Sequence, residues 1–289
     1  MVQKLLIYIS TYKEKFLHTA TEKANKLFQV LDNHPLEGIE GSFKISMGGF
    51  QKKRLLMGIQ RKDITESILF NILYQLNMPN HFVQIFQSHL PLSNIILFGF
   101  EESTTHFYYK VYLEFWEKNK KLLEYSMQDK TKLLQYIGFK WDAIHLNQEY
   151  ITMYDYYPRI YIAMILKRLE HLFSQTDLKK HSKTLIEIIQ SMILYATQSI
   201  EKPEDKLIYL EANEHNNLRC SFDLNLYKAN ITLGDIEVYI YKLCRLFSIS
   251  KTDVYHFINQ IKSKPLGHIS GGTDRHGKAF LTCYYELSF

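Results

Sequence analysis

One segment of the sequence, His106–Trp116 (HFYYKVYLEFW), carries groups that could bind or move charge. Its odd-numbered positions are apolar, whereas its even-numbered positions include Lys110, Tyr112 and Glu114. This period of two predicts a β-strand with two unlike faces and does not fit a helix. A face that combines Lys, Tyr and Glu with a Trp indicates the wall of an enclosed polar cavity.

Four other predicted strand pairs alternate in the same way, so their polar residues would face the same interior. The predicted lining comprises Glu40, Ser42, Lys44, Lys52 and Arg54; Lys110, Tyr112, Glu114 and Trp116; Tyr150, Thr152, Tyr154 and Tyr156; Arg219, Ser221, Asp223 and Asn225; and Thr282, Tyr284 and Glu286. Basic groups from three hairpins would meet there. A buried basic cluster needs compensation, which a small polyanion such as a diphosphate would provide.

The tyrosines of this lining indicate what such an anion would be attached to. Tyr150, Tyr154 and Tyr156 share one strand face. A Tyr hydroxyl can donate to phosphate, and the face of its ring stabilises a cation. This combination suits a substrate that leaves a carbocation behind when it loses diphosphate.

A plainer interpretation of the same residues stays open at this point. Arg219 could pair with Asp223, and Lys110 with Glu114, along a single strand face. The tyrosines could simply fill the interior. None of the residues is a unique signature by itself.

These side chains need a scaffold, and the hydrophobic pattern predicts five hairpins separated by helices. The hairpins span about 37–60, 93–116, 137–156, 206–227 and 266–287, and one of the helices spans 118–136. An open sheet of ten strands would expose two long edges, whereas closure removes them. We therefore predict an α+β fold, a ten-stranded antiparallel barrel surrounded by helices, as one domain over residues 1–289.

Composition narrows the functional class. The 35 basic and 30 acidic residues give a net charge of +5 without a basic run, which disfavours nucleic acid as a partner. Three cysteines without metal spacing, and no secretory or membrane-spanning segment, predict a cytoplasmic protein. We also expect it to be a monomer. His268 and His276 are expected at the surface, and no metal ligands are assigned.

Several segments resemble a known family. They are IEGSFKI at 39–45, KRLLMGI at 53–59, GFEESTTHFYYKVYLEF at 99–115, YIGFKWD at 136–142 and the terminal FLTCYYELSF. In their order and spacing they resemble the ABBA-fold prenyltransferases, and most closely those that modify cyanobactin-type ribosomal cyclic peptides. The likeness extends over essentially the whole chain.

The resemblance implies roles for individual residues. Glu40 matches the carboxylate that takes the acceptor's proton, and Arg54 and Lys110 match basic residues that hold diphosphate. Family members tend to carry basic groups two and four residues after that lysine, where this chain has Tyr112 and Glu114. Arg219 is expected to supply the missing charge, and Tyr112 is expected beside Lys110 as a donor or a shield.

The implied reaction is transfer of a dimethylallyl or longer prenyl group from its diphosphate to a peptide side chain. Tyr150, Tyr154, Tyr156 and Tyr284 would shield the allyl cation. Glu114 and Asp223 could grip a guanidinium, so Arg or His is one possible acceptor and Tyr or another aromatic group the other. Mg²⁺ would be held mainly by diphosphate oxygens, because Asp-rich clusters are absent. An aromatic small-molecule prenyltransferase and a non-catalytic barrel that binds a hydrophobic anion or peptide are the alternatives.

Overall fold

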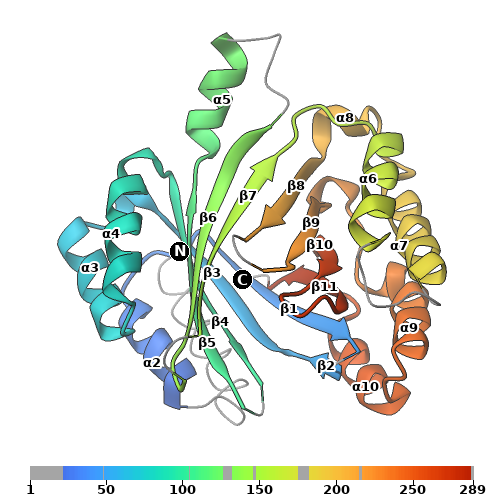
Figure 1. Cartoon of the computed structure of the whole chain (residues 1–289), viewed down its shortest axis with the longest axis horizontal. Coiled ribbons are helices and arrows are strands. Elements are labelled where there is room, and N and C mark those ends of the chain that lie inside the picture. Colours follow the sequence, from blue (N-terminus) through green and yellow to red (C-terminus); the bar gives the residue numbers. More distant parts are fainter. Residues whose placement is uncertain are drawn as a thin grey trace.

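The computed structural model describes most of the chain (Figure 1). The described residues are 22–47, 49–103, 105–125, 132–145, 148–174, 182–214 and 217–287. Apolar spacing also predicts a helix over residues 2–31, and its part up to residue 21 lies outside these ranges, as do parts of four predicted hairpins, at Gly48, Thr104, 146–147 and 215–216.

A single antiparallel sheet runs through the molecule. Its strands are β1 Gly38–Ser46, β2 Gly49–Gln51, β3 Lys53–Gln60, β4 Ile95–Glu102, β5 Phe107–Glu114, β6 Leu133–Asp142, β7 Glu149–Tyr156, β8 Ile208–Asn213, β9 Cys220–Asn225, β10 Leu266–Thr273 and β11 Ala279–Glu286. Each strand pairs with its neighbour in the chain, except that β2 and β3 both pair with β1. The pairing of β1 with β11, in which Glu40 lies opposite Glu286, closes the sheet into a barrel.

Strands β2 and β3 are two parts of one interrupted strand. Opposite β1, Lys44 faces Gln51 whereas Gly41 faces Leu55, so the β2–β3 side contains one extra residue. This is the count of a β-bulge, which reverses the side-chain parity beyond it. Counting the two parts as one strand confirms the predicted ten-stranded antiparallel barrel.

Most helices cover the outside of the barrel, whereas one, α5 Trp116–Tyr125, projects from its end, as Figure 1 shows. The other helices are α2 Glu22–Leu31, α3 Glu66–Gln75, α4 Asn80–His89, α6 Ile162–Ser174, α7 Ser182–Thr197, α8 Pro203–Lys206, α9 Glu237–Leu246 and α10 Lys251–Ile261. The odd-numbered apolar residues of β5, such as Val111 and Leu113, are buried in the core between barrel and helices. Aromatic rings join the layers, with Phe28 against Phe100, Phe86 against Phe139, Phe173 against Phe222, and Phe257 against Phe43.

One predicted element is wrong. The helix expected over 118–136 ends at Tyr125, and the chain re-enters the sheet at Leu133. Apolar spacing in this region fits a helix and a strand equally well, and ladder hydrogen bonds to β5 and β7 decide the outcome. Tyr136 therefore belongs to a strand of the barrel. Among the described residues, no helix has both the length and the apolar character that crossing a bilayer requires.

Candidate active site

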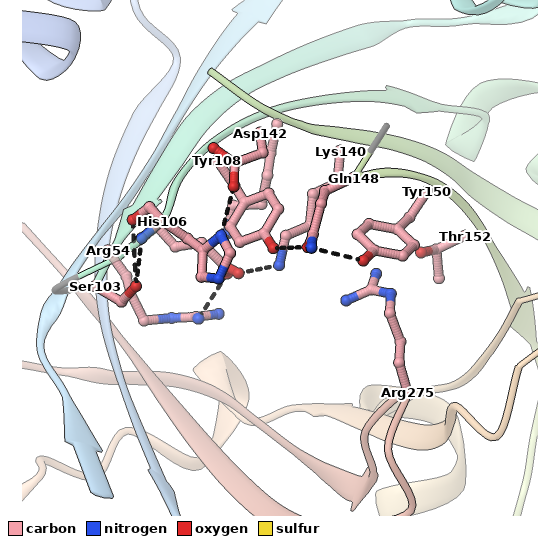
Figure 2. Close-up of polar contacts among 12 residues, drawn as sticks. Arg54, Ser103, His106, Tyr108, Lys140, Asp142, Gln148, Tyr150, Thr152 and Arg275 are labelled. Atoms are coloured by element: carbon pink, nitrogen blue, oxygen red, sulfur yellow. Dashed lines mark hydrogen bonds and ion pairs between the residues drawn. The ribbon is translucent and has the colours of Figure 1, made fainter. Parts of the chain in front are cut away.

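The barrel interior divides into two halves of opposite charge. We call the end that carries Lys44, Arg54, Glu101, Lys110, Lys140, Glu214, Arg219 and Arg275 the basic half (Figure 2). We call the end that carries Glu40, Glu114, Asp223, Tyr227 and His268 the acidic half. Cross-strand register produces this division, because Arg54 lies opposite Glu101 at one end of the barrel and Glu114 opposite Ile95 at the other.

Glu101 is the centre of the basic half. Its Oε2 atom accepts a hydrogen bond of 2.6 Å from Nη1 of Arg54 and lies 3.4 Å from Nζ of Lys110. Its Oε1 atom pairs with Nζ of Lys140. These cations hold the pKa of Glu101 well below its usual value although burial opposes ionisation. One carboxylate therefore serves three cations, and none of the three has its charge fully balanced.

A second group of charges completes the basic half. Glu214 pairs with Arg275 and, at 3.3 Å, with Nη1 of Arg219. The guanidinium of Arg275 also lies 3.6 Å from the ring centroid of Tyr150 (Figure 2). The Nε atom of Arg219 is buried without a hydrogen-bond partner, as is Oγ of Ser221 on the neighbouring β9. Buried unpaired polar atoms are uncommon in native proteins and indicate a missing ligand or water.

The lysines of the basic half show the effect of this uncompensated charge. Burial, followed by repulsion from Arg54, lowers the pKa of Lys44 and of Lys110 to about 8. Burial also lowers the pKa of Lys140. The half contains six cationic side chains against two paired carboxylates, an excess of four positive charges. A bound polyanion would relieve this repulsion.

A belt of tyrosines lies between the two halves. Tyr112, Tyr136, Tyr154 and Tyr284 all line a cavity of about 530 Å³ that reaches from Lys110 to the acidic half. The ring of Tyr154 packs edge to face, at 6.0 Å, on both Tyr112 and Tyr136. Gly138 lies opposite Tyr112 on β6, and a Cβ atom there would come within 2.7 Å of the Tyr112 ring. The glycine thus leaves room for the belt.

The acidic half contains a chain of hydrogen bonds centred on His268. Its Nδ1 atom lies 2.9 Å from the carboxylate oxygens of Asp223, and its Nε2 atom lies 3.2 Å from Oε2 of Glu40. Burial lowers the pKa of His268, but the two carboxylates outweigh burial and raise it to about 10. The imidazolium therefore donates to both. Tyr227 donates to the other oxygen of Glu40.

The partners of Glu40 also determine its protonation state. Burial raises the pKa of this carboxyl. The charge and hydrogen bond of His268 and the hydrogen bond from Tyr227 together outweigh burial, so the pKa of Glu40 lies below its usual value. Glu40 is therefore an ionised carboxylate at the wall of the cavity. An ionised, positioned carboxylate is what a general base requires.

Glu114 lies in the same half with different partners. Its Oε1 atom accepts from the Tyr136 hydroxyl at 2.8 Å, and its Oε2 atom accepts from Nδ2 of Asn94 at 3.0 Å. Burial raises the pKa of Glu114. Each oxygen accepts one hydrogen bond from a neutral side chain, so a guanidinium bound at Glu114 would share the carboxylate with Tyr136 and Asn94.

The structure brings most of the sequence-predicted site residues to the lumen. Lining the cavity are Glu40, Lys110, Tyr112, Glu114, Tyr154, Asp223 and Tyr284. Arg54 and Arg219 lie in the basic half, and Tyr150 lies at its mouth beneath Arg275. Three other predicted lining residues lie elsewhere.

Tyr156 packs on Trp116 at 5.9 Å, in a second hydrophobic cluster near α5, so neither lines the cavity. The shielding role predicted for Tyr156 does not fit this placement. Lys52 is exposed, with its ammonium 6.0 Å from the Phe257 ring outside the barrel, because the bulge between β2 and β3 reverses its face. The surface position predicted for His268 is also wrong, since this residue lies within β10, just after a register shift between Leu266 and His268, and its side chain contacts Asp223 inside the barrel.

Sequence reasoning missed seven residues of the site. The residues not assigned to it are Glu101, Tyr136, Lys140, Glu214, Tyr227, His268 and Arg275. A signal existed for two of them, because Tyr136 and Lys140 alternate with the apolar Ile137 and Phe139 in the same way as the residues of His106–Trp116. Nothing local distinguishes Glu101 from its neighbour Glu102, which pairs with Lys53 instead.

The described residues do not provide a Mg²⁺ site in the basic half. Mg²⁺ prefers oxygen ligands in octahedral geometry. Glu101 and Glu214 are the carboxylates there, and both are already paired with cations. The Mg²⁺ expected from the sequence would thus depend on the substrate's own phosphate oxygens.

Comparison with known proteins gives results at the level of structure alone. No protein-family model and no curated protein matches the chain. Among solved structures, 6-dimethylallyltryptophan synthase from Micromonospora olivasterospora in complex with DMASPP and Trp has a TM-score of 0.56 at 10% identity, covering 86% of this chain and 82% of that chain.

Two further structures are similar over nearly the full length. The apo form of the prenyltransferase PriB has a TM-score of 0.60 at 9% identity, with 99% of this chain and 96% of that chain covered. NotF in complex with brevianamide F and DMSPP has a TM-score of 0.54 at 11% identity, with 98% and 93% covered. At such identities the likeness establishes the architecture, and the chain has the ABBA barrel fold found in these prenyltransferases.

Proposed function

We propose that the protein transfers a prenyl group from dimethylallyl diphosphate, or a longer homologue, to a side chain of a ribosomal peptide. The observation that carries the proposal is the incomplete basic half, in which six cations surround two carboxylates and the buried Nε of Arg219 has no partner. Structural neighbours in complex with DMASPP and DMSPP, which are prenyl diphosphate ligands, support the same chemistry.

The diphosphate would occupy the basic half. Its oxygens would accept hydrogen bonds from Arg54, Lys110 and Lys140, which now share Glu101, and from the unpaired Nε of Arg219. Charge-assisted hydrogen bonds of this kind are strong, and they become stronger as negative charge builds up on the leaving group. The basic half would therefore stabilise departure of the diphosphate.

The tyrosine belt would hold the prenyl chain. When the bond between the allylic carbon and the diphosphate oxygen breaks, its electron pair leaves with the diphosphate and an allyl cation remains. The rings of Tyr112, Tyr154 and Tyr284 line the cavity beside Lys110, where they would stabilise this cation and exclude water. Burial raises the pKa of Tyr112 and of Tyr154, which keeps both hydroxyls neutral and unreactive toward the cation.

Glu40 would receive the proton of the acceptor. The nucleophilic atom forms its bond to the allylic carbon and releases its proton, which passes to the ionised Glu40 carboxylate. His268 and Tyr227 hold that carboxylate in place. With His268 protonated, the Glu40–His268–Asp223 unit carries one net negative charge, which favours the cation across the cavity.

The same unit bears on the type of acceptor. A guanidinium gripped by Glu40 and Asp223 would need the position that His268 already occupies, since His268 lies within 3.2 Å of both carboxylates. The imidazolium of His268 is thus the cation that lies between Glu40 and Asp223. We therefore favour Tyr or another aromatic side chain over Arg as the acceptor.

A second candidate is transfer to an aromatic small molecule. The neighbour in complex with Trp favours it. Peptide acceptors rest on the sequence resemblance to cyanobactin-type enzymes, so the two candidates need a direct comparison.

The deciding experiment is incubation of the full chain with dimethylallyl diphosphate and a panel of acceptors. The panel contains cyclic and linear peptides that differ only in one Tyr, Trp, Arg, His or Ser, together with free Tyr and Trp. We expect mass spectrometry to find a prenyl increment on a Tyr or Trp peptide. Increments on the free amino acids alone would establish the second candidate.

Two controls separate catalysis from binding. If no acceptor gains mass but dimethylallyl diphosphate binds in calorimetry, the protein is a non-catalytic barrel, and if it does not bind at all the proposal fails. A parallel reaction contains EDTA. Since the basic half already has excess positive charge, we expect turnover to continue in the presence of EDTA. Loss of turnover with EDTA would instead support the Mg²⁺ dependence predicted from the sequence.

A further inference from the structure

A group of three possible metal ligands lies at the rim of the barrel. His106 directly precedes β5, Asp142 ends β6, and His145 follows in the next turn. One ligand atom from each residue lies within 4.8 Å of the other two, and among the described residues no other group of His, Cys, Asp or Glu meets this criterion. Figure 2 shows His106 and Asp142 together at the end of the barrel that carries Arg54 and Lys140.

The contacts among the three residues point to one common centre. Nδ1 of His106 lies 2.6 Å from Oδ2 of Asp142, and Nδ1 of His145 lies 3.3 Å from the same oxygen. The two imidazole rings are 4.9 Å apart. The other carboxylate oxygen, Oδ1, is occupied by the backbone N–H of Ile144 at 2.8 Å. Two rings and one carboxylate oxygen therefore converge, while the remaining oxygen fixes the carboxylate.

The distances suit a small transition-metal ion. Ligands about 2.1 Å from a tetrahedral ion lie roughly 3.4 Å apart, close to the separation of His145 and Asp142. The contact between His106 and Asp142 has to lengthen, by less than about 1 Å, and the partly exposed His106 and the exposed His145 are able to adjust. Imidazole nitrogens favour Zn²⁺, Co²⁺ or Ni²⁺ over Mg²⁺.

We propose that His106, Asp142 and His145 bind one divalent transition-metal ion, with water at the remaining coordination positions. The Asp142 carboxylate at the centre is buried, and its contacts with His106 and with the backbone N–H of Ile144 fix its orientation. The ion would join the start of β5 to the turn after β6. His106 stacks on Tyr108, whose ring lies under Nζ of Lys140, so the ion would stiffen the rim of the basic half.

The test is titration of the full chain with Co²⁺ after removal of metals by chelator dialysis. We expect visible absorption bands that saturate at one ion per chain, are displaced by Zn²⁺ and persist in excess Mg²⁺. His145→Ala should weaken Co²⁺ binding by about tenfold or more. His276→Ala, at an exposed histidine of the β10–β11 turn, is the matched control and should bind Co²⁺ as the unaltered chain does.

His145 is exposed, so its substitution should leave the fold intact, which circular dichroism would verify. Saturable binding that is the same in His145→Ala, His106→Ala and His276→Ala would overturn the proposal, as would the absence of saturable binding in the unaltered chain. The melting temperature with and without Zn²⁺, measured by differential scanning fluorimetry, gives an independent check. Zn²⁺ should raise the melting temperature of the unaltered chain and of His276→Ala, but not that of His145→Ala.

Discussion

The two halves of the barrel lumen differ in whether their buried charged groups have partners within the chain. In the acidic half every carboxylate named above has partners within the chain, such as His268 for Asp223 and Tyr227 for Glu40. In the basic half Glu101 is divided among three cations, and Arg219 retains a buried unpaired N–H. The carboxylates of the acidic half have their hydrogen-bond partners, whereas the cations of the basic half lack an anion.

This difference separates two tasks that a transferase site must perform. A general base has to be held in one ionised position before the substrate arrives, which a complete network achieves. A site for a charged leaving group has to bind, and later release, an external anion, so it keeps unsatisfied donors. We therefore expect substitutions in the basic half to abolish binding, and those in the acidic half to slow the chemical step.

The largest effect is expected for Arg54→Ala. Removal of this buried guanidinium takes away a partner of Glu101 and a donor to the diphosphate, and a broken buried pair costs on the order of 3–5 kcal/mol. Affinity for dimethylallyl diphosphate in calorimetry should fall by about 10³-fold. Lys53→Ala removes a charge one residue away, where it pairs with Glu102, and should bind the diphosphate normally. Equal losses in both variants would contradict the assignment.

Glu40→Gln should slow the chemical step without affecting diphosphate binding, in contrast to Arg54→Ala. The amide cannot accept the acceptor's proton, so kcat should fall by roughly 10²-fold or more, whereas diphosphate affinity should stay within about twofold. Steady-state kinetics and calorimetry on the same preparation measure the two quantities. A loss of diphosphate affinity as large as the loss of kcat would show that the halves are not separate.

The pH dependence of diphosphate binding follows from the lysines. In the free protein the pKa of Lys44 and of Lys110 is about 8, and a bound anion would raise both. Binding then takes up protons, so affinity is full below pH 8 and decreases above it, by up to about tenfold per lysine between pH 7 and 9. Calorimetry in buffers of different ionisation enthalpy measures the uptake. Affinity that rises with pH would contradict this account.

The smallest effect, and the most specific, is expected for His268→Ala. Its loss uncovers the carboxylates of Glu40 and Asp223, so a cationic acceptor could enter between them. The ratio of turnover with an Arg peptide to that with a Tyr peptide should rise about tenfold, even though total activity falls. An unchanged ratio in competition experiments would remove His268 from acceptor selection.

Sequence periodicity was sufficient to predict the barrel and several residues of its interior. Parity on single strands placed Arg54, Lys110 and Tyr112 correctly, because neighbours two residues apart share a face whatever the register. It failed at Lys52, where a bulge of one residue reversed the face. Parity also cannot indicate which charges meet across strands.

Long-range pairing explains why the partners in the site escaped prediction. His268 reaches Glu40 over 228 positions of sequence, and Arg54 reaches Glu101 over 47. These contacts exist only because the sheet closes and fixes the stagger of each strand. Individual residues could be inferred locally, whereas their pairing depends on the complete barrel.

Closure of the barrel between β1 and β11 also has a consequence for biosynthesis. During translation β1 emerges early, but the strand that covers its free edge is made more than two hundred residues later. Until then the edge of β1 that will pair with β11 remains unpaired next to Glu40, and it could pair with other chains. Such long-range pairing also slows folding. The nascent chain is therefore expected to need protection from aggregation, and its catalytic carboxylate to reach its final environment only after β11 has docked.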